Sequence, residues 1–194
     1  YPTGRGVPRF SHPGFREAAV TYMNKVFEAR PGLRALTVGP PDGALKMDAR
    51  DIPRYGKPGD TFAQKAANYM WDFHVYLAEA LKKSHPDKYL IYMPGSGADA
   101  VPTNIDEFPD NILIAPRLGN ASQRVLGVVN KRGLARHRNW LDKMDTVHRA
   151  PQWDHWLYYR RASHPRYPVV FTRSLQQQMK ECIPYVSGKF IEIQ

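Results

Sequence analysis

The chain has 194 residues, of which 42% are hydrophobic and 12% aromatic, a composition that argues against a disordered chain and suffices for the core of one domain. A single cysteine, Cys182, excludes an internal disulfide and a cysteine-based zinc or iron–sulfur site within one chain. No apolar run approaches the length of a membrane span. Because the chain begins at Tyr1 without a leader-like segment, we expect a processed protein or a piece of a longer one.

The formal net charge of +10 would attract nucleic acid, an anionic membrane or an acidic polymer. Residues 111–141 contain no acidic side chain but have the basic residues Arg117, Arg124, Lys131, Arg132, Arg136 and Arg138. A solvated face or a surface for a partner chain would explain such a stretch. Because the stretch contains no recognised nucleic-acid-binding module, the sequence argues against nucleic acid as the partner.

The first predicted element is a helix that begins near Pro13, because proline is compatible with the first turn of a helix. Its apolar positions recur at helical spacing and are Phe15, Ala19, Tyr22 and Val26. Pro31 and Gly32 predict the end of this helix.

An apolar run at residues 33–38 predicts a strand, which stops at the Gly-Pro-Pro-Asp-Gly segment of residues 39–43. Asp42 therefore follows the carboxyl end of a strand, the edge at which ligands bind in sheets of alternating strands and helices. On this basis Asp42 is a candidate catalytic acid. The alternative is that Asp42 and Gly43 form only a turn, since both residues tolerate tight turns for local backbone reasons.

The clearest helix in the sequence is predicted at residues 62–83, with Asp60 or Thr61 as its N-cap. One apolar stripe runs along it and consists of Phe62, Ala66, Tyr69, Phe73, Tyr76, Leu77 and Ala80. This pattern predicts a helix that packs on a sheet. His74 lies inside the helix, where we expect a hydrogen-bonded structural histidine rather than a metal ligand.

Further strands are predicted at residues 89–93, 111–115, 153–159 and 189–193, and further helices at residues 123–129, 134–144 and 175–183. Strands that alternate with helices favour parallel pairing in chain order. The sequence therefore predicts an α/β fold, a partial or complete (β/α) barrel of the TIM type, as a single domain over residues 1–194. Because eight strand–helix units usually need about 250 residues, we expect this barrel segment to belong to a longer polypeptide or an assembly.

Residues 95–100 imitate a dinucleotide-binding fingerprint after a strand, but residues 101–104 look extended rather than helical. The sequence also lacks a phosphate-binding loop of the Gly-Lys-Ser/Thr kind and the His-Glu-x-x-His spacing of a zinc-binding helix. We therefore expect no cofactor and no bound metal.

The segment at residues 153–159 combines aromatic rings with an acid and a histidine. Strand alternation assigns Asp154, Trp156 and Tyr158 to one side and Trp153, His155, Leu157 and Tyr159 to the other. Aromatic rings near carboxylates suit sugars, whose C–H faces stack on rings while their hydroxyl groups need polar partners. The alternative is that these rings pack between barrel strands and helices.

Glu192 lies between Ile191 and Ile193 near a strand end, and an acid with apolar neighbours can face inward with the raised pKa that a general acid needs. The candidate catalytic residues are thus Asp42, Asp154 and Glu192. The candidate substrate contacts are Trp153, Trp156, Tyr158, Tyr92, His155 and Arg117. Arg117 follows a predicted strand, and its guanidinium group could bind a uronate or a sulfate.

Several segments of the chain together resemble an uncharacterised bacterial domain family related to α-glucuronidases and hexosaminidases; they are residues 36–43, 68–93, 110–117, 153–159 and 188–192. The resemblance covers most of the chain after Ser11. It implies a glycoside-hydrolase-like barrel from a large secreted or periplasmic protein. Many members of that family have a segment like Asn-Asp-Gly followed by a cysteine-containing loop. This chain has Pro41-Asp42-Gly43 followed by residues 44–48, Ala-Leu-Lys-Met-Asp, which include no cysteine. Members also have barrel strands before and after the region present here.

The leading hypothesis is a carbohydrate-active, glycoside-hydrolase-like domain that acts on or binds a bacterial or environmental polysaccharide. The alternative is a non-catalytic structural subunit or scaffold that associates with other chains. Strands near Leu36 and Ile191 would have unpaired edges in a partial barrel, so we also expect self-association or a partner polypeptide that supplies the missing strands. No membrane partner is expected.

Overall fold

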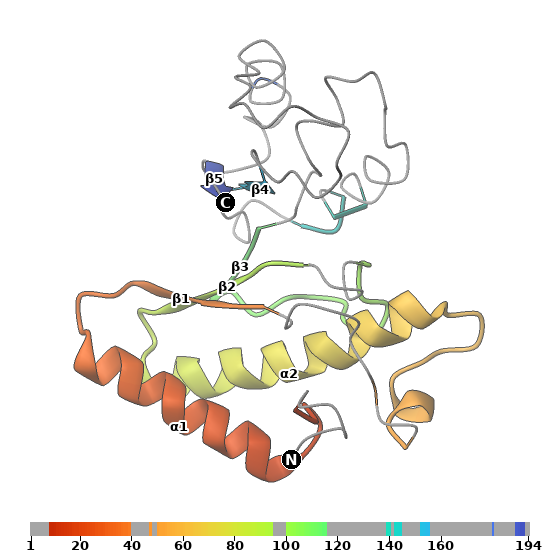
Figure 1. Cartoon of the computed structure of the whole chain (residues 1–194), viewed down its shortest axis with the longest axis horizontal. Helices are drawn as coiled ribbons and strands as arrows, with labels where there is room; N and C mark the ends of the chain where they lie inside the picture. The colour runs from red at the N-terminus through yellow and green to blue at the C-terminus, as the bar shows by residue number, and fades with distance from the viewer. Residues whose placement is uncertain are drawn as a thin grey trace, which may run out of the picture. The chain divides into compact units, whose positions relative to one another are not determined.

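The structure is a computed structural model of the whole chain, and it describes residues 8–39, 47, 50–94, 100–115, 139–140, 142–144, 152–155, 180 and 189–192 (Figure 1). The backbone contacts divide the chain into two compact units, Tyr1–Ile114 and Ala115–Gln194. Each unit is described by itself below. The described strands form two sheets, one with three strands in the first unit and one with two strands in the second.

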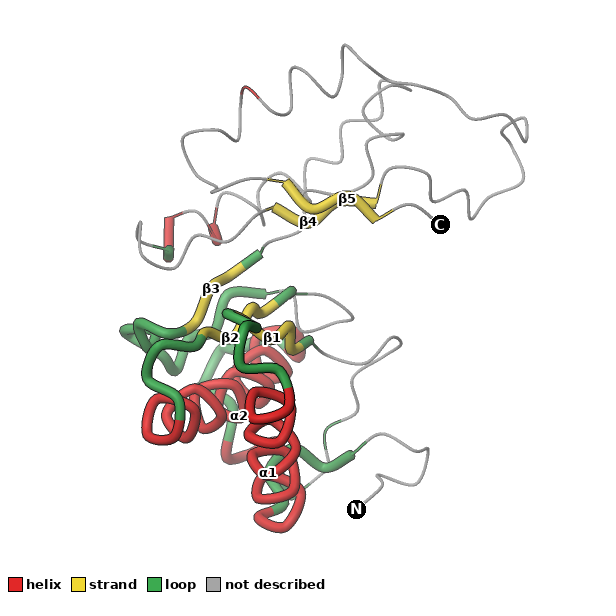
Figure 2. The backbone as a smooth tube through the Cα atoms, turned by 90° about the vertical axis from the view of Figure 1, so that its left-hand side faces the viewer, coloured by secondary structure: helices red, strands yellow, loops and turns green. Residues whose placement is uncertain are grey.

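The first unit consists of α1 (Pro13–Ala29), β1 (Ala35–Val38), the short 3-10 helix η1 (Ile52–Arg54), α2 (Phe62–Ser84), β2 (Tyr89–Tyr92) and β3 (Ile112–Ile114). Its sheet has the order β1-β2-β3, with both strand pairs parallel. The register aligns Leu36 with Leu90 and Leu90 with Ile112. Both helices lie on one face of this sheet (Figures 1 and 2). The predicted parallel pairing in chain order is therefore confirmed for the first three strands.

Helix α1 begins at Pro13, as the sequence predicts, and it packs against α2. The side chains that it buries are Met23 and Phe27, which lie four positions apart on one face. Tyr22, one of the apolar positions at helical spacing, is not buried, because it is 67% exposed. The buried stripe is rotated by one residue relative to the predicted one, and the hydroxyl group of Tyr22 allows that ring to remain in water.

Helix α2 begins with a capping box, in which the Thr61 hydroxyl accepts from the backbone N–H of Gln64 and the Gln64 side chain accepts from the backbone N–H of Thr61. Its buried residues are Ala66, Ala67, Asn68, Tyr69, Met70, Trp71, Phe73, His74, Leu77, Ala78 and Leu81. The predicted helix and its packing role are thus confirmed. Phe62 is the exception to the predicted stripe, because this first residue of the helix is 57% exposed.

The face of the sheet toward α2 forms the centre of the core. Leu90 and Tyr92 of β2 are buried, and their register partners Ile112 and Ile114 are buried beside them. The ring of Tyr92 contacts Trp71 of α2 at a centroid distance of 4.5 Å. Because side chains alternate along a strand, Ile91 belongs to the opposite face, where it is only half-buried.

The second unit contains β4 (Gln152–His155) and β5 (Lys189–Glu192), which pair in parallel. The predicted fourth strand was residues 153–159, of which residues 156–159 lie outside the described part of the chain. Trp140 and Met144 are buried, and residues 139–140 and 142–143 are helical, as the sequence predicts for residues 134–144.

The described structure is a mixed α/β fold with an open parallel sheet in the first unit. The coarse prediction of parallel strands flanked by helices is confirmed for that unit. A closed or continuous barrel, and a single domain over the whole chain, remain predictions.

Candidate functional site

The three strands of the first unit end at Val38, Tyr92 and Ile114, and these ends share one edge of the sheet because the strands are parallel. Trp71 and His74 of α2 contact Tyr92, the last residue of β2. The part of α2 before Trp71 therefore continues past this edge (Figure 1). The segments at residues 8–11, 50–60 and 100–108 pack on that projecting half of the helix, and they form the candidate site.

His74 is a buried ionisable residue of α2 that contacts Tyr92 at the end of β2. Its Nδ1 atom lies 2.7 Å from the carbonyl oxygen of Met70, and the carbonyl can only accept, so Nδ1 carries the proton. Its ring is 4.3 Å from that of Tyr92, measured between centroids. Burial lowers the pKa of His74 from 6.5 to about 4, although the carbonyl groups of Met70 and Val38 act in the opposite direction. His74 is therefore neutral near pH 7, in agreement with the predicted structural role.

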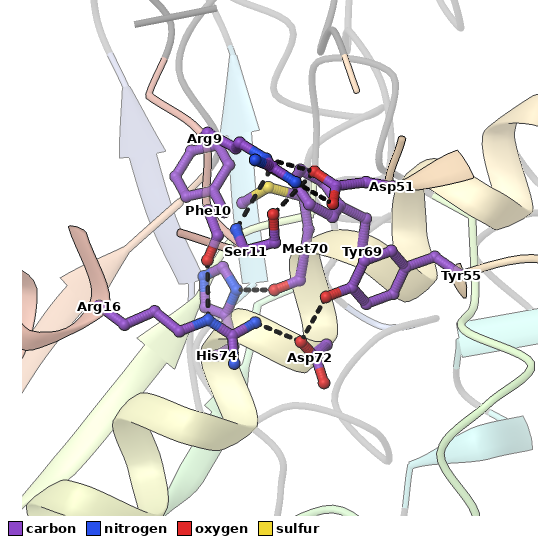
Figure 3. Close-up of polar contacts among 10 residues, drawn as sticks. All are labelled: Arg9, Phe10, Ser11, Arg16, Asp51, Tyr55, Tyr69, Met70, Asp72 and His74. Carbon is purple, nitrogen blue, oxygen red and sulfur yellow. Dashed lines mark hydrogen bonds and ion pairs between the residues drawn. The ribbon is translucent and has the colours of Figure 1, made fainter. Parts of the chain in front are cut away.

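An ion pair joins the N-terminal segment to the loop that follows β1 (Figure 3). The Arg9 guanidinium donates from Nε to Oδ2 of Asp51 at 3.0 Å and from Nη2 to Oδ1 at 2.8 Å. The hydroxyl of Ser11 donates to the same Oδ2 atom at 2.7 Å. Only 4% of the Asp51 side chain is exposed, so these donors replace the water that a carboxylate otherwise requires.

A second charged group lies between α1 and α2. Arg16 donates from Nη2 to Oδ2 of Asp72 and from Nε to the carbonyl oxygen of Phe10 at 2.8 Å. The Tyr55 hydroxyl donates to the same carboxylate oxygen of Asp72 at 2.9 Å. Burial, and then the charge of Asp72, raise the pKa of Tyr55 to about 12. Tyr55 thus remains a protonated hydrogen-bond donor over the whole physiological range.

Asn68 holds two loops against the projecting half of α2. Its Nδ2 atom donates to the backbone carbonyl of Tyr55 at 2.9 Å and to the hydroxyl of Thr103 at 3.0 Å. Its Oδ1 atom accepts from the backbone N–H of Thr103 at 2.7 Å. The loop after β1 and the loop after β2 are therefore both fixed by one fully buried amide.

Aromatic rings fill the space between these polar groups. Phe10 lies 5.1 Å from Phe73 and 5.9 Å from Tyr69, measured between ring centroids. Trp71 lies 4.6 Å from Phe108. These rings are buried, so in the described structure they act as core side chains rather than as open platforms for a ligand.

The predicted site residues divide into three groups. Asp42, Trp156, Tyr158 and Arg117 lie outside the residues that the structure describes, and their roles remain predictions. Tyr92 is fully buried against α2, so neither face of its ring is open for a sugar to stack, and we do not retain it as a substrate contact. The remaining candidates lie on β4 and β5.

The pairing of β4 with β5 decides which of these candidates are neighbours. His155 and Glu192 are register partners at the carboxyl ends of the two strands. Asp154 pairs with Ile191 and Trp153 with Phe190. Glu192 is thus the register partner of His155 and not of Asp154.

The sequence reasoning did not identify Asp51, Asp72 and Asn68, which hold the candidate site together. Their partners are far away in the sequence: Arg9 is 42 positions from Asp51, and Arg16 is 56 positions from Asp72. The one local signal was Asn68 itself, a polar residue next to Tyr69 of the predicted apolar stripe.

Within the described residues, no three histidine, cysteine, aspartate or glutamate side chains are arranged to hold a metal ion. None of the described helices has the length and apolar character required to cross a membrane. Comparisons with protein-family models, with curated proteins and with solved structures give no match for this chain.

Proposed function

We propose that this chain is a carbohydrate-active domain of the glycoside-hydrolase type that acts on or binds a polysaccharide. The observation that carries the proposal is the parallel pairing of β4 and β5, in which Glu192 and His155 are register partners at the carboxyl ends. In α/β sheets and barrels this is the edge at which ligands bind. An acid beside a histidine there is a suitable pair for proton transfer to or from a glycosidic oxygen.

Glycoside cleavage commonly uses two carboxyl groups, one of which protonates the leaving oxygen. We assign the first of these roles to Glu192, and Asp42 and Asp154 are the candidates for the second. Trp153, Trp156 and Tyr158 are the candidate stacking rings, His155 is a candidate hydrogen-bonding partner, and Arg117 is a candidate partner for an acidic sugar. A secreted or periplasmic location rests on the family resemblance alone.

The proposal is tested with the purified chain and a panel of neutral and uronate-containing polysaccharides, with binding measured by calorimetry and cleavage by reducing-end release. We expect binding of at least one polysaccharide, and a fall in turnover of about 10²–10⁴-fold for Glu192→Gln, the usual contribution of a general acid. Asp42→Asn is expected to abolish turnover while the circular dichroism spectrum is unchanged.

Glu79→Gln is the matched control, because Glu79 is an exposed acid on α2. Equal activities of the Glu192→Gln and Glu79→Gln variants would remove the catalytic role of Glu192. The absence of both binding and cleavage across the panel would reject the carbohydrate proposal as a whole.

The second candidate function is a non-catalytic subunit that associates with other chains. It is favoured by β1, which among the described residues pairs with a strand on one side only. Size-exclusion chromatography with light scattering distinguishes the two candidates, since the chain alone has a mass of 22.2 kDa. A stable monomer at that mass would count against the subunit role.

A further inference from the structure

His74 lies where α2 crosses the carboxyl ends of β1 and β2. Its side chain is 1% exposed, and its ring is surrounded by those of Tyr92, Phe73 and Trp71 at centroid distances of 4.3, 5.7 and 5.9 Å. The carbonyl group of Val38, the last residue of β1, is also close to the ring. A single side chain thus contacts the helix and the ends of two neighbouring strands.

The hydrogen bond of His74 fixes its chemical state. Nδ1 donates to the carbonyl of Met70, so the neutral ring has its lone pair on Nε2. Nε2 is buried and makes no hydrogen bond of ordinary geometry within the described structure, although the carbonyl group of Val38 lies near the ring. A second proton would therefore place a full positive charge on a ring that is packed among aromatic groups and shielded from water.

Among the residues that the structure describes, no charged side chain is near enough to this ring to compensate for such a charge. The strands that pack against it, β1 and β2, contain no charged residue, and the titratable groups of β2 are the phenols of Tyr92, which contacts the ring, and of Tyr89 at the start of the strand. On α2 the nearest acid is Asp72, and its carboxylate is engaged by Arg16 and Tyr55 (Figure 3). Phe10, which packs on Phe73, brings no charge either.

We propose that His74 makes the junction between α2 and the carboxyl ends of β1 and β2 sensitive to acid. While its imidazole is neutral, the ring stabilises the packing of α2 on these strand ends. When the ring takes up a second proton, the junction opens. This opening exposes the ring to water, where the imidazolium ion is hydrated. The connections after β1 and β2 begin at this junction. Its opening therefore changes the edge of the sheet at which a ligand would bind.

The direction of the pH effect follows from linkage. The pKa of His74 is about 4 in the closed form and 6.5 in water, so the open form binds more protons between these values. Stability of the junction is therefore fully present above pH 6.5 and is lost as the pH falls toward 4. Because the pKa is 6.5 in water and about 4 in the closed form, the full loss corresponds to an increase of about 300-fold in the equilibrium constant for opening.

The first test is a nuclear magnetic resonance titration of the unmodified chain, in which long-range ¹H–¹⁵N correlations report the tautomer and protonation of each histidine. We expect one histidine in the Nδ1–H tautomer that does not titrate until the junction opens, below about pH 5. Its signal is assigned by its loss in His74→Asn, whose amide can still donate to Met70. A histidine at position 74 that titrates near pH 6.5 while the fold is intact would overturn the proposal.

The second test is chemical denaturation at pH 7.0 and pH 4.5 for the unmodified chain, His74→Asn and the control His85→Asn. His85 lies at the end of α2 and is only half-buried. We expect the unmodified chain and His85→Asn to lose stability at pH 4.5, and His74→Asn to lose markedly less, although it is less stable at pH 7.0. Equal losses in all three would overturn the proposal. If His74→Asn does not fold, His74→Gln replaces it, and the titration of the unmodified chain still decides the protonation of His74.

Trp71 gives a direct readout of the junction, because its ring packs on both Tyr92 and His74. The fluorescence of the unmodified chain minus that of Trp71→Phe isolates this residue from the other tryptophans. We expect this difference signal to change at a higher pH than the far-ultraviolet circular dichroism, which reports the helices. Coincident changes would show global unfolding instead of local opening of the junction, and would overturn the proposal.

Discussion

Arg9 and Asp51, which are 42 positions apart in the sequence, form a two-point ion pair with distances of 3.0 and 2.8 Å. The pair connects the segment before α1 to the loop after β1, directly before η1. The ion pair thus anchors the long connection after β1, which has little regular structure, through a carboxylate that is almost completely buried. This relationship leads to the first of four predictions.

We predict that Asp51→Ala lowers the free energy of unfolding by about 3 kcal/mol, because it leaves the Arg9 guanidinium and the Ser11 hydroxyl without their acceptor in a partly buried site. Urea denaturation monitored by circular dichroism measures this loss. The control is Asp110→Ala, which removes the exposed ion pair with Lys82 at 2.7 Å. Since both of those side chains are more than half exposed, at 54% and 63%, the control is expected to change the midpoint little. Equal effects of the two variants would contradict the role of Asp51.

Thr61→Ala is expected to destabilise the first unit by about 1 kcal/mol, because it removes the hydroxyl of the capping box at the start of α2. The measurement is thermal or urea unfolding of the purified variant. Thr21→Ala serves as the control, because Thr21 is exposed within α1 and alanine is the better helix former. A loss in Thr21→Ala as large as that in Thr61→Ala would show that the cap contributes nothing specific.

For Asn68→Ala we expect a loss of about 3 kcal/mol, because the buried carbonyl of Tyr55 and the N–H of Thr103 lose their partner. The variant should also increase amide exchange in residues 100–104, which Asn68 holds against α2. Asn104→Ala is the matched control, since this neighbouring asparagine is exposed. Unchanged exchange at Thr103 in the Asn68→Ala variant would contradict the proposed fastening of this loop.

The fourth prediction concerns the outer edge of β1. Among the described residues this strand pairs only with β2, and an unprotected parallel edge invites a partner. We therefore predict slow amide exchange along residues 36–38 in the native protein, because another chain or this chain's own N-terminal segment covers the edge. Hydrogen exchange followed by mass spectrometry tests this, with the central strand β2 as the protected reference. Fast exchange at residues 36–38 would mean an open edge.

Much of the fold of the first unit could be predicted because its signals are local. The helical spacing of apolar residues and the Thr61 cap predict α2, and Pro13 predicts the start of α1. Apolar runs bounded by turn residues predict β1, β2 and β3 to within two residues at either end. Tyr22 and Phe62 fit the apolar spacing of their helices but are exposed. Spacing gives the period of a stripe, whereas the partner surface decides which residues at its margin are covered.

The candidate site was less predictable, for a different physical reason. Glu192 and His155 were each candidates by composition, but only strand pairing makes them register partners. Tyr92 was expected to contact a substrate, whereas α2 covers it completely. In both cases the deciding factor is the neighbour that a side chain acquires from a distant part of the chain.

By itself the sequence determined the order of the α-helices and strands of the first unit and the structural role expected of His74, since propensity, capping and apolar spacing act over a few residues. Only the tertiary structure decided that Arg9 pairs with Asp51, that Asn68 fastens two loops and that the His74 ring meets the ends of two strands. Such contacts depend on how α2 crosses the sheet and on which loops fold over its projecting half, and local sequence preferences contain no information about that arrangement.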